Sequence, residues 1–322
     1  MRGDEVTAMA RQAGRRDEGV CWVLVGPTAS GKSAVALELA RRRPTEIVSV
    51  DSMQVYRGMD IGTAKPTPQE RALVPHHMVD VLDPGEQCNV GRFCRMARRA
   101  IREIRARGNR PLIVGGAPLY LKGLMWGLME APSGDAHVRA RLKEELARHG
   151  RSALHERLAV ADPEAAARIH PNDVQRLLRA LEVCELTGLP ISAGQRQFSG
   201  RPRLSHRLVG LRRQRAELYA RIERRVDETM ARGLLAEVES LRGRLGPQAG
   251  QALGYKELTD HLDARISLDD AVRLIKRNTR RYAKHQLTWF RHFGLLQWVD
   301  AGPGDSPAEV ADRCEALLSR PA

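Results

Sequence analysis

Short apolar runs alternate along this chain with segments in which apolar residues recur at helical spacing. The runs cover residues 22–25, 47–50, 78–82, 112–114 and 208–211 and are rich in residues that favour strands. Alternation of strands with helices is typical of a parallel sheet that carries helices on both faces. The pattern therefore predicts an α/β fold.

The interval between the runs at 112–114 and 208–211 is too long for one crossover connection. Much of it has helical spacing, over residues 137–149, 154–158, 163–169 and 174–186. We therefore expect an all-helical insertion in the α/β core, bounded near Met129 and Arg207 by turn-forming residues. The predicted organisation is a disordered tail at 1–19, a catalytic core at 20–129 and 207–322, and an insertion domain at 130–206.

The first apolar run leads into a glycine-bounded loop that fits the phosphate-binding pattern G-x-x-x-x-G-K-[ST] at every defined position. Its residues are Gly26, Pro27, Thr28, Ala29, Ser30, Gly31, Lys32 and Ser33. Such a loop turns backbone N–H groups inward, and the helix that follows directs its positive N-terminal end at the same point. Lys32 would add a positive charge at the terminal phosphate, and Ser33 would offer a hydroxyl to Mg²⁺. The alternative is a glycine-rich turn in which Lys-Ser occurs by chance.

Asp51 stands where the second apolar run ends. Open α/β sheets bind ligands at the carboxyl ends of their strands, so Asp51 should share a rim with the phosphate-binding loop. A carboxylate there can accept a proton or hold Mg²⁺ through water; alternatively, it caps the next turn through Ser52. An ordinary ATPase should also carry an apolar strand that ends in Asp, whereas the run PLIVGG ends in two glycines.

Composition adds information about partners and compartment. The chain has 53 Lys and Arg against 39 Asp and Glu, a net charge of +14, which suits a polyanionic partner unless the arginines merely cover solvated faces. The five cysteines lack a C-x-x-C pair and metal-binding His spacing, so we expect reduced thiols in a cytoplasmic protein and no zinc site. Neither an N-terminal apolar segment nor an apolar run of about 18 residues occurs, which argues against secretion and a membrane span.

Several motifs occur in a specific order: GPTASGKS, SVDSMQVYRGMDIGTAKP, VGGAPLYLKGL, HPNDVQRLLRALEV, LGYKEL and KHQLTWFR. In this combination they resemble the bacterial tRNA dimethylallyltransferases, also called isopentenyl-tRNA transferases, over residues 23–298. The resemblance implies a P-loop NTPase-like core, a parallel sheet flanked by helices, with an all-helical insertion domain. It also implies Mg²⁺-dependent transfer of a dimethylallyl group from dimethylallyl diphosphate to N6 of adenosine 37, beside the tRNA anticodon.

In such a reaction the loop holds a leaving group. An adenine amine is a poor nucleophile, whereas an allylic diphosphate ionises easily once the departing charge is stabilised. Lys32, the loop N–H groups and Mg²⁺ on Ser33 would stabilise that charge, and Asp51 would accept the N6 proton. By resemblance to the family, Arg221 also binds the diphosphate; Arg224 is the alternative, and a solvated Arg/Glu helix face is the competing interpretation.

The target base must leave the stacked anticodon loop to be modified, so the enzyme needs a pocket for the base and contacts to the anticodon stem-loop. The segments that match tRNA-contacting stretches of the family are Asp51, Ser52, Met53 and Gln54; Gln175, Arg176, Leu177, Leu178 and Arg179; Gln251, Ala252, Leu253, Gly254, Tyr255 and Lys256; and Lys284, His285 and Arg291. At His285 the family usually has Arg.

Residues 269–293 have the pattern of one amphipathic helix. Its predicted packing face consists of Val272, Ile275, Thr279, Tyr282, Gln286, Trp289 and Phe293, and the basic stripe beside it consists of Arg273, Arg277, Arg280, Lys284 and Arg291. We expect the stripe to contact RNA phosphates and Trp289 to lie in the core rather than stack on a base.

Ala117 departs from the family pattern G-G-T-x-L-Y, because Thr usually follows the two glycines; a hydroxyl expected near the reacting groups is therefore missing. Two other functions stay open on the sequence alone. A nucleoside or nucleotide kinase would use the same loop to transfer the γ-phosphoryl group of ATP. A non-catalytic RNA-binding protein would carry a degenerate loop, against which the intact Lys32 and Asp51 argue. We further expect a monomer.

Overall fold

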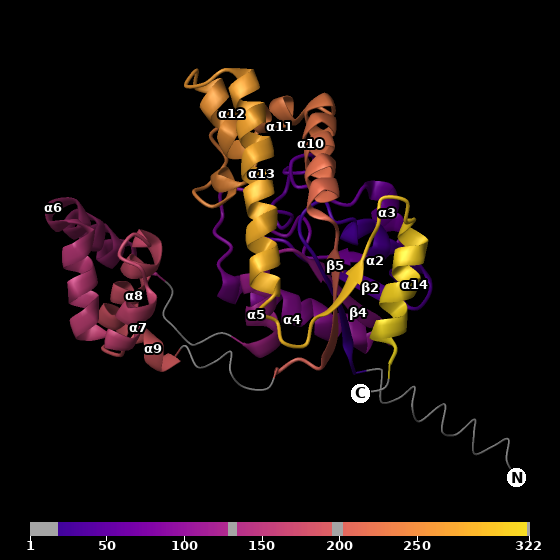
Figure 1. Ribbon diagram of the computed structural model, residues 1–322, viewed down its shortest axis with the longest axis horizontal. Helices are drawn as coiled ribbons and strands as arrows, with labels where there is room; N and C mark the ends of the chain where they lie inside the picture. The colour runs from indigo at the N-terminus through magenta and orange to yellow at the C-terminus, as the bar shows by residue number, and fades with distance from the viewer. Residues whose placement is uncertain (1–18, 128–133, 195–201, 321–322) are drawn as a thin grey trace, which may run out of the picture. The chain divides into compact units, whose positions relative to one another are not determined.

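The computed structural model describes residues 19–127, 134–194 and 202–320. These residues form two compact units (Figure 1): one combines the segments up to Leu124 and from Leu204 onward, and the other runs from Met125 to Arg203. The tail predicted at 1–19 lies, apart from Gly19, outside the described residues, and so does the predicted insertion boundary at Met129.

The larger unit is built on a six-stranded parallel sheet with the strand order β3-β2-β4-β1-β5-β6. The strands are β1 Cys21–Val25, β2 Thr45–Val50, β3 His76–His77, β4 Arg110–Gly115, β5 His206–Arg212 and β6 Gln297–Asp300. The predicted strands at 22–25, 47–50, 112–114 and 208–211 are confirmed as β1, β2, β4 and β5. The α/β fold with a parallel sheet is therefore as predicted.

The strand predicted at 78–82 is wrong. The chain pairs with β2 only at His76 and His77 and then leaves the sheet. Met78 and Asp80 have φ angles of 65° and 57°, a left-handed conformation that cannot continue a strand. At the opposite edge the sheet gains β6, which pairs with β5 and of which the apolar pattern gives no sign.

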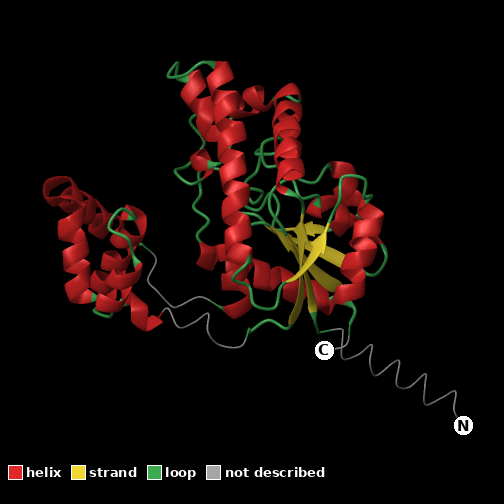
Figure 2. Ribbon diagram, viewed as in Figure 1, coloured by secondary structure: helices red, strands yellow, loops and turns green. Residues whose placement is uncertain are grey.

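Helices cover both faces of the sheet (Figure 2). On one face α2 (Lys32–Arg41) and α14 (Pro307–Leu318) pack on the strands and share a buried cluster with Trp22 and Leu24 of β1. On the other side lies α4 (Val90–Ala106), followed along the chain by α5 (Pro118–Trp126). This layering leaves the carboxyl ends of the central strands for the loops that carry chemistry.

Helices from the second half of the chain complete the larger unit. They are α10 Arg215–Ala231, α11 Leu234–Ser240, α12 Tyr255–Leu262 and α13 Leu268–Phe290, and a short helix, α3 Pro68–Leu73, precedes β3. Helices α10 and α13 pack through Leu218, Ile222 and the small Ala283, against which Ala29 of the phosphate-binding loop also packs. These two helices therefore bring distant parts of the chain to the loop.

The second unit consists of helices, as predicted. They are α6 Ala136–Ala161, α7 Pro163–Arg168, α8 Val174–Thr187 and α9 Ile191–Gly194. Gly150, with φ 79° and ψ 177°, interrupts α6 and separates the segments predicted at 137–149 and 154–158. Leucines of α6 and α8, such as Leu154 and Leu177, form its buried core.

Candidate active site

The loop between β1 and α2 leaves the start of the helix available for an anion. Ser30 N–H donates to the backbone oxygen of Pro27 at 3.2 Å, which closes the loop. Gly31 then adopts a left-handed conformation with φ 94° immediately before α2 begins at Lys32, and α2 has no side-chain cap at this end. Its first backbone N–H groups can therefore bind a phosphate.

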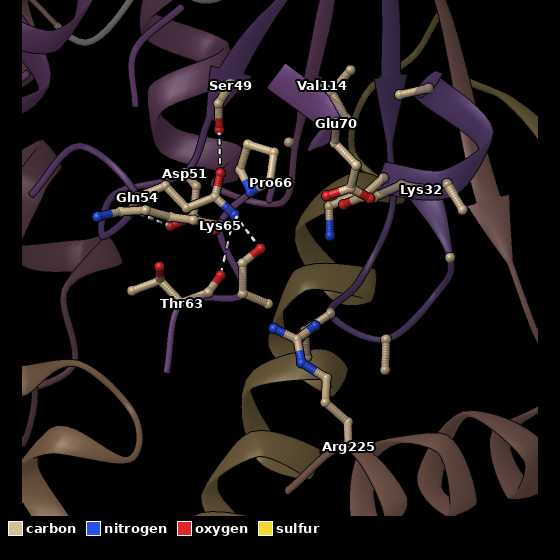
Figure 3. A pocket seen from close by; sticks show the side chains of 18 of the residues that line it. Lys32, Ser49, Asp51, Gln54, Thr63, Lys65, Pro66, Glu70, Val114 and Arg225 are labelled. Atoms are coloured by element: carbon tan, nitrogen blue, oxygen red, sulfur yellow. Dashed lines mark hydrogen bonds between the residues drawn. The ribbon is translucent and has the colours of Figure 1, made fainter. Parts of the chain in front are cut away.

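A cavity of about 540 Å³ opens beside this loop. The loop, the ends of β2 and β4, the segment 63–67 and helices α10 and α13 enclose it, and Figure 3 shows some of the side chains that line it. Lys32, Ser33 and Asp51, which the sequence places in three separate roles, all line this cavity. The structure thus brings the predicted phosphate site and the predicted proton acceptor together.

Lys32 carries its charge in an unfavourable environment. Burial, and to a smaller extent the neighbouring Arg225, lower its pKa to about 8, although Asp51 partly opposes both effects. Its Nζ lies 3.4 Å from the backbone oxygen of Pro27. A bound diphosphate would favour the ammonium form, so Lys32 is electrostatically prepared for an anion.

Two arginines donate hydrogen bonds to the backbone of the loop. Arg221 Nε donates to the backbone oxygen of Ala29 at 2.9 Å, and Arg213 Nε donates to that of Ser30 at 2.8 Å. Arg224, the other candidate for the diphosphate-binding arginine, is exposed. Its Nε lies 3.8 Å from Glu228 Oε1, and its side chain also borders the cavity. The contact to the loop supports Arg221 as the diphosphate-binding arginine.

Two further arginines at the loop, Arg225 and Arg213, were not predicted from the sequence. Arg225 lies one turn beyond Arg221 on α10, lines the cavity and donates from Nη1 to Thr28 Oγ1 at 3.4 Å. Helical spacing from Arg221 was the signal that points to it. Arg213 follows β5, and its place at a strand's carboxyl end was the corresponding signal.

Asp51 both caps a turn and faces the cavity. Its Oδ1 accepts hydrogen bonds from the backbone N–H groups of Met53 (2.8 Å) and Gln54 (3.3 Å), so the capping alternative is correct as a description of this oxygen. Its Oδ2 accepts no hydrogen bond from the part of the chain that the structure describes. One carboxylate can therefore serve the turn and still offer an oxygen to a substrate.

The side chain of Gln54, which belongs to a stretch predicted to contact tRNA, is fully engaged inside the protein. Its Oε1 accepts from Ser49 Oγ at 2.8 Å, and its Nε2 donates to the backbone oxygens of Thr63 (3.1 Å) and Ala64 (3.2 Å), as the dashed lines in Figure 3 show. Both amide hydrogens are used. Gln54 therefore supports the wall of the cavity. A bound base could contact the side of its side chain but would find no free amide N–H.

Oxygen atoms suited to Mg²⁺ lie around the start of α2. Ser33 is exposed there, and Asp51 and Glu70 line the same cavity. Mg²⁺ prefers oxygen ligands and usually keeps several waters, with one or two protein ligands completed by substrate phosphates. No group of three or more His, Cys, Asp or Glu residues that would form a complete protein cage occurs among the described residues. These donors fit a phosphate-bound magnesium ion.

Gln286 of α13 ties the two glycine-rich turns together. Its Oε1 accepts from Thr28 N–H at 2.9 Å, and its Nε2 donates to the backbone oxygen of Gly116 at 2.6 Å. A Cβ on Gly116 would lie 2.4 Å from that Nε2, and one on Gly115 would lie 2.1 Å from the backbone oxygen of Val50. Both glycines are therefore needed for close approach. A buried polar residue within an apolar stripe was the sequence signal for Gln286.

Ala117, the position that departs from the family pattern, is buried at the start of α5. Its backbone oxygen accepts from Leu121 N–H at 3.0 Å, the first hydrogen bond of the helix. Alanine occupies a position at which a Thr hydroxyl could cap the helix.

The packing face predicted for residues 269–293 is partly wrong. Tyr282 is 39% exposed and Trp289 36% exposed, so Trp289 is not a core residue. The buried positions of α13 are Ala271, Ile275, Ala283, Gln286 and Phe290. At the contact with α10 the packed residue is the small Ala283, next to the exposed Tyr282. Lys284, His285 and Arg291, predicted to contact RNA, are exposed.

The stretch predicted to contact RNA on α8 divides into two sets. Leu177 and Leu178 are buried in the core of the helical unit, so their side chains support that unit and do not face solvent. Arg179 Nη1 donates to Glu182 Oε2 at 2.7 Å. Gln175 and Arg176 are exposed and remain available.

The stretch at 251–256 divides in the same way. Ala252, Gly254 and Tyr255 are buried, so they support the fold rather than offer side chains to RNA. Gln251 and Lys256 are exposed, and Leu253 is half-buried. In both stretches the exposed members are polar, as RNA contacts require.

Comparison with known proteins agrees with this geometry. The family described as IPP transferase matches residues 54–293, and the family described as isopentenyl transferase matches residues 20–74. The tRNA dimethylallyltransferase of Geobacillus thermodenitrificans is 50% identical over 300 residues, which cover 92% of this chain and 94% of the relative. That of Symbiobacterium thermophilum is 50% identical over 285 residues, 87% of this chain and 89% of the relative.

Solved structures show the same fold. The full-length tRNA isopentenylpyrophosphate transferase from Bacillus halodurans is 40% identical, with a TM-score of 0.69 over 93% of this chain and 95% of that chain. A eukaryotic dimethylallyltransferase, described as acting on tRNA, is 29% identical, with a TM-score of 0.74 over 88% of this chain and 74% of that chain. Because the family match spans most of the sequence and the relatives are this similar, the chain belongs to the IPP transferase family.

Proposed function

We propose that this protein transfers a dimethylallyl group from dimethylallyl diphosphate to N6 of adenosine 37 in tRNA and releases diphosphate. The observation that carries the proposal is the single cavity in which the phosphate-binding loop, with Lys32 and Arg225, faces Asp51. Family membership supports it, because the similar proteins from Geobacillus and Symbiobacterium are tRNA dimethylallyltransferases.

The reaction breaks one bond and forms another. The C1–O bond of the donor breaks, with its electron pair leaving on the diphosphate, and N6 of adenosine bonds to C1. Lys32, Arg221, Arg225 and the loop N–H groups would stabilise the departing charge. The proton of N6 would pass to Asp51 Oδ2, while Oδ1 keeps the turn in place. No ATP is consumed.

We propose that Mg²⁺ binds together with the diphosphate group of the donor. Ser33, with Asp51 or Glu70 through water, would hold Mg²⁺ next to the diphosphate. When bound, the ion supplies positive charge to the leaving group.

The RNA partner should be the anticodon stem-loop of tRNA. On the larger unit the exposed residues predicted to contact it are Gln251, Lys256, Lys284, His285 and Arg291. On the helical unit they are Gln175 and Arg176. Ser52 and Met53, next to Asp51, are half-buried and would border the extruded base.

We also expect a monomer that works in the cytoplasm. The five cysteines are free, and burial raises the pKa of Cys21, Cys88 and Cys94 to about 11, so these thiols stay protonated and unreactive. Within the described segments, no helix combines the length and apolar character that a membrane crossing needs.

The test uses unmodified tRNA and two labels. In one reaction the protein receives labelled dimethylallyl diphosphate, and in the other γ-labelled ATP. Transfer of the prenyl label to RNA, with a prenylated adenosine found by nucleoside mass spectrometry, is the expected result. Transfer of the γ-phosphoryl label, with none of the prenyl label, would instead show a kinase.

A further inference from the structure

Glu237 of α11 closes a loop that leads to the cavity. Its Oε2 accepts hydrogen bonds from the backbone N–H groups of Asp60 (2.9 Å) and Ile61 (2.7 Å), and its Oε1 accepts one from Gly62 (3.1 Å). These three successive N–H groups lie outside any helix or strand and need partners. The carboxylate holds them as a bound anion would.

Tyr255 fixes the same carboxylate from α12. Its hydroxyl donates to Glu237 Oε1 at 2.5 Å. Burial and the neighbouring Glu237 raise the pKa of Tyr255, so the hydroxyl keeps its proton and stays a donor. The ring packs on Gly62, where an added Cβ would lie 2.4 Å from ring atom Cε2. The loop is thus held by a carboxylate and by a ring that only glycine can approach.

The loop that Glu237 holds carries the partners of Gln54. Immediately after Gly62, the backbone oxygens of Thr63 and Ala64 accept both amide hydrogens of Gln54. The backbone N–H of Gln54 in turn donates to Asp51 Oδ1 at 3.3 Å. Contacts therefore run without a gap from α11 to the carboxylate in the cavity.

We propose that Glu237 is a positioning residue for prenyl transfer: it fixes loop 60–64, which fixes Gln54 and the turn that orients Asp51. The inference rests on the proposed function, because it takes Asp51 as the acceptor of the N6 proton. The phosphate-binding loop belongs to another segment and makes none of these contacts. Disturbing Glu237 should therefore slow the chemical step and leave donor binding unchanged.

The test compares Glu237→Gln with Glu239→Gln. Both variants remove one negative charge from α11, but Glu239 is exposed, which makes it the matched control. Glutamine keeps the size of Glu237 yet directs an NH₂ group at N–H donors, so loop 60–62 loses partners. The measurements are the single-turnover rate at saturating anticodon stem-loop and dimethylallyl diphosphate, the donor dissociation constant and the thermal midpoint.

For Glu237→Gln we expect a rate about 10- to 100-fold below that of the control, the size of loss that a small misplacement of a catalytic group produces. Donor affinity should match that of wild type. Tyr255→Phe removes one of the four hydrogen bonds and should show the same pattern with a smaller loss. If Glu237→Gln does not fold, Tyr255→Phe alone tests the positioning role.

Three results would overturn the inference: a rate equal to that of Glu239→Gln, an equal weakening of donor binding, or a loss explained by a smaller folded fraction. The last two would assign Glu237 a purely structural role. Failure of the proposed function looks different, because wild type and Glu239→Gln would then also transfer no prenyl group.

Discussion

Asp51→Asn separates the two tasks of Asp51, because asparagine can perform only one of them. In the structure Oδ1 accepts from the N–H groups of Met53 (2.8 Å) and Gln54 (3.3 Å). The asparagine oxygen can accept the same hydrogen bonds, so the turn should be preserved. In asparagine an NH₂ group replaces Oδ2, and this group cannot accept the proton of N6.

The size of the effect follows from the lost proton transfer. A general base contributes about 10²- to 10⁴-fold, so the chemical step should slow by at least about 10²-fold. That corresponds to about 3 kcal/mol or more of activation free energy. Asp51 is also the carboxylate that opposes Lys32 and Arg225. Its neutralisation leaves the cavity more positive, so the donor should bind as tightly as before or more tightly.

The assay is single-turnover prenylation of an anticodon stem-loop at saturating RNA and donor, repeated over a series of Mg²⁺ concentrations. Asp83→Asn, which alters an exposed carboxylate 3.0 Å from Arg57, serves as the control. A rate close to wild type would refute the role of Asp51 as base. Recovery of the rate by added Mg²⁺ would make Asp51 a metal-positioning residue instead. Weaker donor binding would contradict the electrostatic reasoning.

Three further predictions concern charge. Because the pKa of Lys32 is lowered to about 8, affinity for dimethylallyl diphosphate should fall as the pH rises through that value, and Lys32→Arg should abolish this step in a binding titration. Arg221→Ala should slow transfer by about 10²-fold, as loss of a group that stabilises developing charge does, whereas Arg224→Ala should stay near wild type; equal losses would contradict the assignment from loop contacts. The affinity for tRNA should fall steeply with salt, and a flat log–log plot would show that the arginines only cover solvated faces.

The sequence predicts those parts of the fold in which local pattern and tertiary structure agree. The central strands β1, β2, β4 and β5 are continuous apolar runs because helices bury both of their faces. The edge strands have two and four residues, too few for a pattern. Positive φ angles at Met78 and Asp80 prevent a strand at 78–82, and the identity of these two residues gives no sign of that conformation.

The site divides in a similar way. Lys32 and Ser33 belong to the loop motif after β1, and Asp51 directly follows β2, so a motif and a strand end suffice to locate them. Arg213 and Gln286 reach the loop from 183 and 258 residues away in sequence; the pairing of β5 with β1 brings Arg213 there, and the packing of α13 brings Gln286. The same packing explains the error in the face of α13, because a count of apolar residues favours large rings where the contact needs a small residue.

The cavity holds its cations close together before any anion arrives. Burial lowers the pKa values of Lys32, Arg221 and Arg225, and Arg225 lowers that of Lys32 further, so the free protein bears unfavourable electrostatics that Asp51 offsets only in part. A diphosphate supplies the missing negative charge, and the interaction strengthens as the C1–O bond breaks and charge moves onto the leaving oxygen. The repulsion that destabilises the empty site is thus the source of stabilisation in the transition state. A substitution that relieves it should stabilise the fold and slow the reaction together.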